Sequence, residues 1–149
     1  MTLSEGNTFV LTTEEIVGDE KKVHINYNGL NDDVAAGNRI LIDDGLIELC
    51  VEKIEGPEIV CRVVNGGELG ERKGVNVPNV KIKLPALTEK DKEDIRFGIK
   101  QGFDFIAASF VRTADCIREI KAMLDEQGSS MKVIAKIENA EGIENCLLY

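Results

Sequence analysis

The hydrophobic pattern of this chain changes its period near residue 83, and no other feature constrains the fold more. Before that point apolar residues alternate with polar ones, which is the spacing of strands that bury one face. After it, apolar residues recur every three or four positions between short apolar runs, as in helices that alternate with buried strands. The sequence therefore predicts an α+β, multi-domain chain, with one part over residues 1–82 and another over residues 83–149.

Five stretches of the first part have the composition and alternation of strands. They are Thr8–Thr12, Lys22–Asn26, Arg39–Ile42, Leu46–Ile54 and Glu58–Val64. The turn-forming sequences between and after them are Asn28-Gly29, Asp44-Gly45, Gly56-Pro57 and Asn65-Gly66-Gly67. Several short strands with turns at this spacing predict a small, mostly antiparallel β-barrel or sandwich.

The second part begins with a helix whose two ends are marked in the sequence. Thr88 is a good N-cap, and Asp91 follows three residues later, as in a capping box. Acidic residues fill the first turns, where the helix dipole favours negative charge. We expect this helix to run over about Glu89–Lys100 and to stop near Gly102, because glycine readily takes the left-handed conformation of a C-cap.

A strand, a second helix and a second strand follow. Phe103–Phe110 is predicted to be a strand, and Thr113 and Gly128 are predicted to start and stop the helix. The apolar face of that helix consists of Cys116, Ile117, Ile120, Met123 and Leu124. Two parallel strands cannot close a barrel, and a parallel sheet needs cover on both faces. We therefore expect this part to belong to something larger.

The second of these strands lies in Met131–Asn139 and ends in two opposite charges. Lys136 and Glu138 are two positions apart, so in a strand both side chains would leave the same face, with Ile137 turned the other way. Opposite charges at the end of a parallel strand are typical of barrel active sites. The alternative is a local ion pair that closes the strand.

The charge balance excludes two classes of partner. Among 149 residues, Lys+Arg 18 against Asp+Glu 27 gives a net charge of −9, and aromatic residues make up only 5%. An acidic chain without a basic run is a poor ligand for nucleic acid and is repelled by anionic membranes. The sequence shows neither a membrane-length apolar run nor a secretory signal, so we expect a cytoplasmic protein.

The cysteines and the histidine offer no catalytic or metal motif. Cys50, Cys61, Cys116 and Cys146 form no CxxC pair, which argues against a zinc site. Cys50 and Cys61 could come close on adjacent strands, but reduced thiols are the default for a cytosolic chain. His24 is interpreted as a surface strand residue, and no GxSxG motif accompanies it.

Four strings stand out by their order and spacing. They are LIDDGLIEL (Leu41–Leu49), NGGELGERKGVNVP (Asn65–Pro78), LPALTEKDKEDIRFG with DFIAASFVR (Leu84–Arg112), and IAKIENAEGIEN (Ile134–Asn145). Together they closely resemble pyruvate kinase, a TIM-barrel enzyme with a mobile β domain inserted after its third barrel strand. The resemblance implies that residues 1–82 are most of this lid, and that residues 83–149 run from the third helix to the fifth strand of the barrel.

The resemblance also assigns roles to single residues. Lys136 matches the catalytic lysine that stabilises the phosphoryl group in transfer, and Glu138 matches a carboxylate ligand of the divalent metal. Lys73, in the KGVN string, matches a lid lysine that reaches the nucleotide phosphates. Asp44 matches a residue that faces the cleft, although a plain turn residue is an equal alternative; Lys73 alone would be a surface lysine.

The implied activity is phosphoryl transfer between phosphoenolpyruvate and ADP, giving pyruvate and ATP. The implied cofactors are Mg²⁺ (or Mn²⁺) and K⁺, and the potassium ligands would lie outside this chain. The full-length family is a homo-tetramer. Ser109 and Arg112 lie near the implied site by position and receive no role.

The chain also departs from the family pattern. The N-terminal barrel strands and the second metal carboxylate are absent, and Cys146–Tyr149 replaces an acidic helical stretch, as a truncation or a shifted reading frame would. We therefore expect no activity from this chain alone. The alternative function is non-enzymatic: an isolated lid that binds nucleotide weakly through Lys73 or not at all, beside a frayed barrel part that self-associates.

Overall fold

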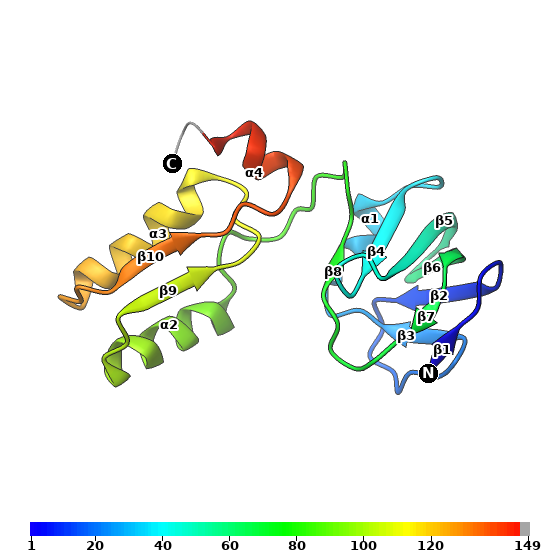
Figure 1. Cartoon of the computed structure of the whole chain (residues 1–149), viewed down its shortest axis with the longest axis horizontal. Coiled ribbons are helices and arrows are strands. Elements are labelled where there is room, and N and C mark those ends of the chain that lie inside the picture. Colours follow the sequence, from blue (N-terminus) through cyan, green and yellow to red (C-terminus); the bar gives the residue numbers. More distant parts are fainter. Residues whose placement is uncertain (147–149) are drawn as a thin grey trace. The chain divides into compact units, whose positions relative to one another are not determined.

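The computed structural model describes residues 1–146 and shows a mixed α+β chain (Figure 1). Two compact units make it up: unit 1 over Met1–Leu84 and unit 2 over Pro85–Tyr149. Of the tail that was singled out in the sequence, residues 147–149 lie outside the described residues. Unit 1 is built mainly from strands, whereas unit 2 alternates helices with strands.

Unit 1 holds one short helix and a series of strands around a curled sheet (Figure 1). The elements are β1 (Thr2–Leu3), β2 (Thr8–Thr12), β3 (Lys22–His24), α1 (Leu30–Asp33), β4 (Arg39–Ile42), β5 (Ile47–Glu55), β6 (Glu58–Asn65), β7 (Gly67–Glu68) and β8 (Val75–Asn76). The six-stranded sheet has the order β3-β2-β6-β5-β4-β8, and β1 pairs with β7. Only the β2–β3 pair of this sheet is parallel.

The strand predictions for unit 1 are largely confirmed. Thr8–Thr12 and Arg39–Ile42 have the observed bounds, and the other predicted strands differ by one or two residues at their ends. The sheet differs from a closed barrel, because within residues 1–146 no ladder joins its edge strands β3 and β8. Helix α1 was not predicted, since four residues offer no helical period.

The inward faces of β5 and β6 form the centre of the core of unit 1. These residues, each at most 2% exposed, are Ile47, Leu49, Val51, Ile59, Cys61 and Val63. Within residues 47–51 and 59–63 every second residue is buried in this core, as expected for strands that bury one face. Burial raises the pKa of the Cys61 thiol to about 12, so this thiol stays protonated and inert at neutral pH.

A buried carboxylate ties the exit of unit 1 to helix α1. The side chain of Asp33 is only 1% exposed. Its Oδ2 accepts from the hydroxyl of Tyr27 at 2.7 Å and from the backbone N–H of Lys83 at 2.9 Å, and the Lys83 ammonium lies 3.1 Å from Oδ1. Burial by itself would raise the pKa of Asp33, but these three donors outweigh it and lower the pKa.

Unit 2 begins with a helix and continues as a βαβ arrangement (Figure 1). The elements are α2 (Glu89–Gln101), β9 (Phe105–Ala108), α3 (Ala114–Glu126), β10 (Lys132–Ala135) and α4 (Ala140–Glu144). Strands β9 and β10 pair in parallel, with Phe105 opposite Lys132 and Ala108 opposite Ala135. The predicted order of helix, strand, helix and strand is therefore confirmed, although both strands are shorter than predicted and α4 was not predicted.

The ends of helix α2 follow the sequence signals. The hydroxyl of Thr88 accepts from the N–H of Asp91 at 3.1 Å, and the Asp91 carboxylate accepts from the N–H of Thr88 at 2.8 Å. Gly102 ends the helix in the left-handed conformation, with φ of 71°. Thr113 occupies the predicted N-cap of α3, but its side chain makes no capping hydrogen bond.

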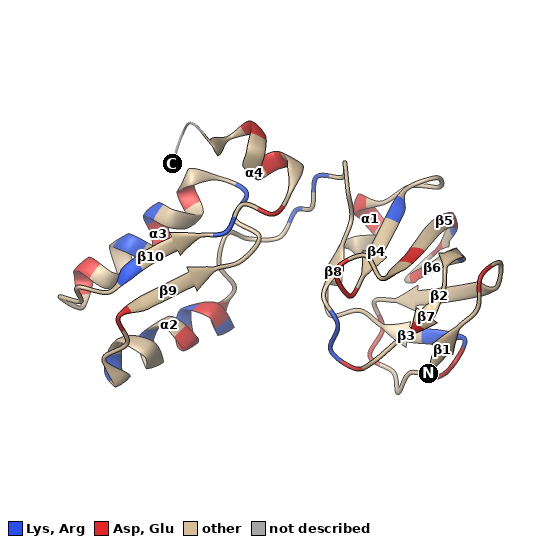
Figure 2. Ribbon diagram, in the orientation of Figure 1, with Lys and Arg blue, Asp and Glu red and all other residues tan. Residues whose placement is uncertain are grey.

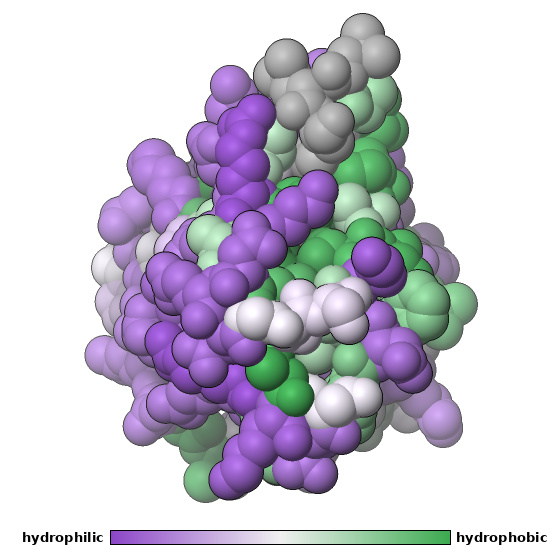
Figure 3. Space-filling model, turned by 90° about the vertical axis from the view of Figure 1, so that its left-hand side faces the viewer, coloured by the Kyte–Doolittle hydropathy of each residue, from purple (hydrophilic) through white to green (hydrophobic). Residues whose placement is uncertain are grey.

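One face of the β9–β10 sheet is covered and the other is not. Ile106, Ala108, Val133 and Ala135 pack against a core that includes Ile120 of α3. The alternate residues point away from that core, and among them Phe105 is 62% exposed and Ile134 is 49% exposed. Figure 3 shows apolar areas, in green, that interrupt the hydrophilic surface.

Within residues 1–146, no helix combines the length and hydrophobicity that a membrane crossing requires. All four cysteines are free: Cys61 and Cys116 are buried, Cys50 is half-buried, and Cys146 is exposed.

Candidate functional site

The parallel register brings the carboxyl ends of β9 and β10 to the same edge of unit 2. The ladder continues beyond the strands, because the N–H of Lys136 donates to the carbonyl of Ala108 at 2.9 Å and the N–H of Val111 donates to the carbonyl of Lys136 at 3.1 Å. Backbone hydrogen bonds on both sides of Lys136 therefore hold the base of its side chain in a defined place. The turn Ser109-Phe110 lies directly opposite it.

The charged side chains at this edge form a small cluster. The Nζ of Lys136 lies 3.1 Å from Oε1 of Glu138 and 3.1 Å from the hydroxyl oxygen of Ser109. The side chains of Lys136 and Glu138 are 45% and 35% exposed. The prediction that both charges leave the same side is confirmed. The cluster formed by Ser109, Phe110, Lys136 and Glu138 is called the strand-end cluster below.

Phe110 orients the carboxylate of Glu138 through its backbone. Its N–H donates to Oε2 of Glu138 at 3.1 Å. This bond, together with the ammonium of Lys136, lowers the pKa of Glu138, so the carboxylate is ionised at neutral pH. Phe110 has φ of 52°, in the left-handed region that bulky residues rarely adopt. Such strain costs about 1–3 kcal/mol and tends to occur at functional sites.

Arg112 lies close in sequence to the cluster but has structural contacts. Its guanidinium donates to the carbonyl of Pro85 at 3.1 Å, and its carbonyl accepts from the side-chain amide of Asn145 at 3.1 Å. The amide of Asn139 likewise donates to the carbonyl of Val111 at 3.3 Å. These bonds connect the turn after β9 to the start of unit 2 and to α4.

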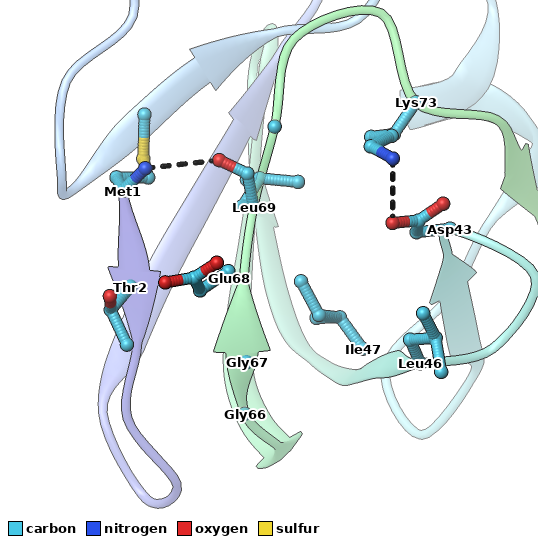
Figure 4. A pocket seen from close by; sticks show the side chains of 11 residues that line it. Met1, Thr2, Asp43, Leu46, Ile47, Gly66, Gly67, Glu68, Leu69 and Lys73 are labelled. Atoms are coloured by element: carbon cyan, nitrogen blue, oxygen red, sulfur yellow. Dashed lines mark hydrogen bonds and ion pairs between the residues drawn. The ribbon is translucent and has the colours of Figure 1, made fainter.

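Lys73 lies in unit 1, at the side of a pocket of about 740 Å³. Its Nζ lies 2.9 Å from Oδ2 of Asp43, and Figure 4 shows the two side chains pointing toward one another. Gly66, Gly67 and Gly70 contribute to the lining, so backbone is accessible there. The side chain of Lys73 is 37% exposed, so it is reachable from solvent.

The two aspartates of the turn between β4 and β5 differ in their surroundings. Asp43 lines the pocket and pairs with Lys73, whereas Asp44 is exposed and does not line it. Both have positive φ, 54° and 55°, which aspartate tolerates in tight turns. The two sequence candidates, Lys73 and Asp44, are therefore not paired with each other; Lys73 pairs with Asp43 instead.

The strand-end cluster fits part of a divalent metal site. Glu138 offers hard carboxylate oxygens, the ligands that Mg²⁺ and Mn²⁺ prefer. Across the part of the chain that the structure describes, no group of three or more His, Cys, Asp or Glu side chains is placed to hold a metal ion. An ion at Glu138 would therefore take most of its ligands from water or from a bound substrate.

Charge is spread over both units rather than gathered. Figure 2 shows acidic and basic residues side by side on α2 and α3 and on several strands of unit 1. Ion pairs such as Lys90–Asp94 and Arg118–Asp115 account for part of this mixing. The expectation that this chain is a poor nucleic-acid ligand stays a prediction.

Sequence reasoning missed two residues of the strand-end cluster and the partner of Lys73. Ser109 received no role, Phe110 was placed inside a strand, and Asp43 was passed over for its neighbour Asp44. The only available signal for Ser109 was its place at the end of an apolar strand opposite Lys136. Nothing in the sequence marks a phenylalanine for positive φ.

Comparison with known proteins connects this geometry to a family. A family model described as "Pyruvate kinase, barrel domain" matches residues 1–147. The pyruvate kinase of Clostridium acetobutylicum is 50% identical over 145 residues, which covers 96% of this chain and 31% of the relative. Pyruvate kinases of Staphylococcus aureus strains USA300 and NCTC 8325 are 49% identical over 145 residues, again 96% of this chain but 25% of each relative. The chain thus spans between a quarter and a third of the length of these relatives.

Proposed function

This chain belongs to the pyruvate kinase family, and on that premise we propose that it supplies part of a site for phosphoryl transfer between phosphoenolpyruvate and ADP, giving pyruvate and ATP in glycolysis. The observation that supports this most is the ammonium of Lys136, held at a strand end by Ser109 and Glu138. Phosphoryl transfer depends on positive charge placed at the phosphate oxygens, with little covalent help from the protein.

In this proposal each member of the strand-end cluster has one task. Lys136 donates to an oxygen of the transferred phosphoryl group and stabilises its negative charge. Glu138 is one ligand of Mg²⁺ or Mn²⁺, and the N–H of Phe110 keeps its carboxylate ionised and oriented. The bound divalent ion would neutralise phosphate charge and align the substrates. The K⁺ of the proposed enzyme would be held by residues outside this chain.

Lys73 is proposed to reach the nucleotide phosphates from unit 1. Its ion pair with Asp43 is partly exposed, so a phosphate can replace the carboxylate as the partner of the ammonium at small cost. Asp44, exposed in the same turn, is proposed to face the cleft beside the nucleotide, as a weaker member of the nucleotide-binding residues. The pocket beside Lys73 leaves room for such an approach.

The architecture proposed for the whole enzyme follows the family. Residues 1–82 would be a lid domain that closes over the nucleotide, and residues 83–149 would form part of a TIM barrel. The complete protein would be a cytoplasmic homo-tetramer. The uncovered face of β9 and β10 supports the barrel assignment, because a parallel sheet is covered on both faces in a complete fold.

We expect the 149-residue chain alone to release no measurable pyruvate. The reason is that Glu138 lacks partner carboxylates among residues 1–146, and one exposed carboxylate binds Mg²⁺ only at about millimolar levels or weaker. A coupled assay of pyruvate release tests this. Turnover near that of a full-length family member would contradict the expectation.

A paramagnetic titration tests the metal role of Glu138 directly. Mn²⁺ added to the ¹⁵N-labelled chain should broaden the amide signals of Phe110 and Glu138 before others. Glu138→Gln should remove this selectivity, while Glu126→Gln, at the exposed end of α3, serves as the control and should leave it intact. Equal broadening at many acidic residues, unaffected by Glu138→Gln, would refute the metal site.

The non-enzymatic alternative is favoured by one observation. Unit 1 has its own core of buried residues, drawn from β1, β2, α1 and the strands that follow, and such a core is enough for separate folding. An isolated lid would then bind nucleotide weakly through Lys73 or not at all. Titration of the chain with ADP separates the cases, because Lys73→Met should abolish any signal shift that a phosphate contact causes.

A further inference from the structure

Ser109 is the residue of the strand-end cluster that the proposed function leaves without a task. It is the first residue after β9, it is exposed, and its hydroxyl oxygen lies 3.1 Å from the Nζ of Lys136. The contact joins residues that are 27 positions apart. It therefore depends on the parallel register of β9 and β10 and not on local sequence.

The chemistry of the two groups decides the direction of this hydrogen bond. A lysine ammonium has three donors and no acceptor, so Ser109 must accept. A second ammonium donor goes to Oε1 of Glu138. Two of three donors are thus directed by the protein, and a tetrahedral ammonium with two directions set has its third direction set as well.

We propose that Ser109 is a positioning residue for the ammonium of Lys136, which it holds so that the third N–H faces an incoming phosphoryl oxygen. This inference rests on the proposed function of the strand-end cluster. Without Ser109, the strongest partner left to the ammonium is the carboxylate of Glu138. The lysine would then turn toward Glu138 and compete with the divalent ion for its oxygens.

Partial exposure makes this second anchor necessary. The Lys136 side chain is 45% exposed, so packing alone does not hold its four-carbon chain in one rotamer. An exposed ion pair contributes little to stability and tolerates many geometries. The neutral hydroxyl of Ser109 fixes the orientation of the Lys136 ammonium at little electrostatic cost, because it does not neutralise the positive charge that binds the phosphate.

The first test is a titration of the 149-residue chain with inorganic phosphate, followed by NMR of the amide signals of the strand-end cluster. Ser109→Ala is expected to weaken the apparent Kd about three- to tenfold, the effect of one net hydrogen bond. Ser109→Thr keeps the hydroxyl and should stay within about twofold of the original chain. Ser130→Ala, at an exposed serine before β10, is the matched control and should change nothing.

The second readout does not depend on phosphate. The two Hε protons of Lys136 should have distinct chemical shifts while the ammonium is held, and should merge in Ser109→Ala but not in Ser109→Thr. A serine that only supports the fold would alter amide shifts without merging these two signals. The amide spectrum of each variant verifies that unit 2 stays folded.

The outcomes separate this inference from the proposed function. If Lys136→Met abolishes phosphate binding while Ser109→Ala leaves both the Kd and the Hε signals unchanged, Ser109 has no positioning role and the proposed function stands. If Lys136→Met leaves phosphate binding unchanged, or if the original chain binds no phosphate, the proposed role of Lys136 fails. The Hε signals then still decide whether Ser109 holds the ammonium.

Discussion

Units 1 and 2 solve the same problem of burying an apolar sheet face in different ways. In unit 1 an almost entirely antiparallel sheet curls round one core, so each strand needs only one apolar face. In unit 2 one face of the two-stranded parallel sheet packs against the core, and Phe105 and Ile134 on the other face are exposed. Unit 1 therefore buries its apolar sheet face by itself, whereas unit 2 leaves one apolar face of its sheet exposed to solvent.

The largest expected effect comes from truncating a buried side chain in the core of unit 1. Leu49 is fully buried, and Leu49→Ala should lower the free energy of unfolding of unit 1 by about 2–5 kcal/mol through lost burial and a cavity. Urea titration followed by amide hydrogen exchange measures the free energy of unfolding of each unit separately. If the units fold separately, protection of unit 2 should not change, while loss of protection in both would break the comparison. Val64→Ala, at an exposed site, should stay within about 0.5 kcal/mol of the original chain.

Asp33 tests whether a polar link also stabilises unit 1. Asp33→Ala removes a buried carboxylate that accepts from the Tyr27 hydroxyl and the Lys83 N–H, which should cost about 1–3 kcal/mol in urea unfolding. Because its pKa is lowered in the folded state, the contribution of Asp33 is present above its unfolded pKa and is lost as pH falls through the folded pKa. A destabilisation that stays constant down to pH 2 would contradict this linkage.

Two threonines of unit 2 allow a matched test of local stabilisation. Thr88→Ala removes a capping box and should destabilise α2 by about 1 kcal/mol. Thr113→Ala removes no side-chain capping bond from α3 and should cost only a few tenths of a kcal/mol. Thermal unfolding followed by circular dichroism compares them. Equal losses would show that unit 2 depends on something other than its caps.

The smallest expected effect concerns the titration of Glu138. Its pKa lies below the ordinary value, first because of the Phe110 N–H and then because of the Lys136 ammonium. Lys136→Met should therefore raise the pKa of Glu138 without restoring the ordinary value, as measured by ¹³C NMR of the carboxyl carbon. A full return to the ordinary value would show that Phe110 does not act on Glu138. Any stability that Glu138 contributes is lost as pH falls through this lowered pKa.

Local signals were enough for much of the fold. The bounds of β2 and β4, the capping box at Thr88 and the stop at Gly102 all follow from side chains within a few residues of one another. The order of helices and strands in unit 2 was predictable for the same reason. The family resemblance of the whole chain, later confirmed by comparison, also rests on contiguous strings.

The candidate site was predictable only in part. The sequence placed Lys136 and Glu138 on one side because strand alternation is local. It did not predict the contact between Asp43 and Lys73. These residues are 30 positions apart, and the β5–β6 hairpin lies between them in the chain. Nor did it predict that β3 pairs in parallel with β2, or that the sheet stays open because no ladder joins β3 and β8.

The sequence by itself determined the longer strands and helices, where two helices begin, and to which family the chain belongs; it missed the short elements β1, α1, β7, β8 and α4. Only the tertiary structure decided that Asp33 is buried, that Phe110 takes a positive φ and that Ser109 accepts from Lys136. The physical reason is range. Propensity, capping and alternation act over a few residues, whereas these three features arise from hydrogen bonds between segments 27 to 50 positions apart.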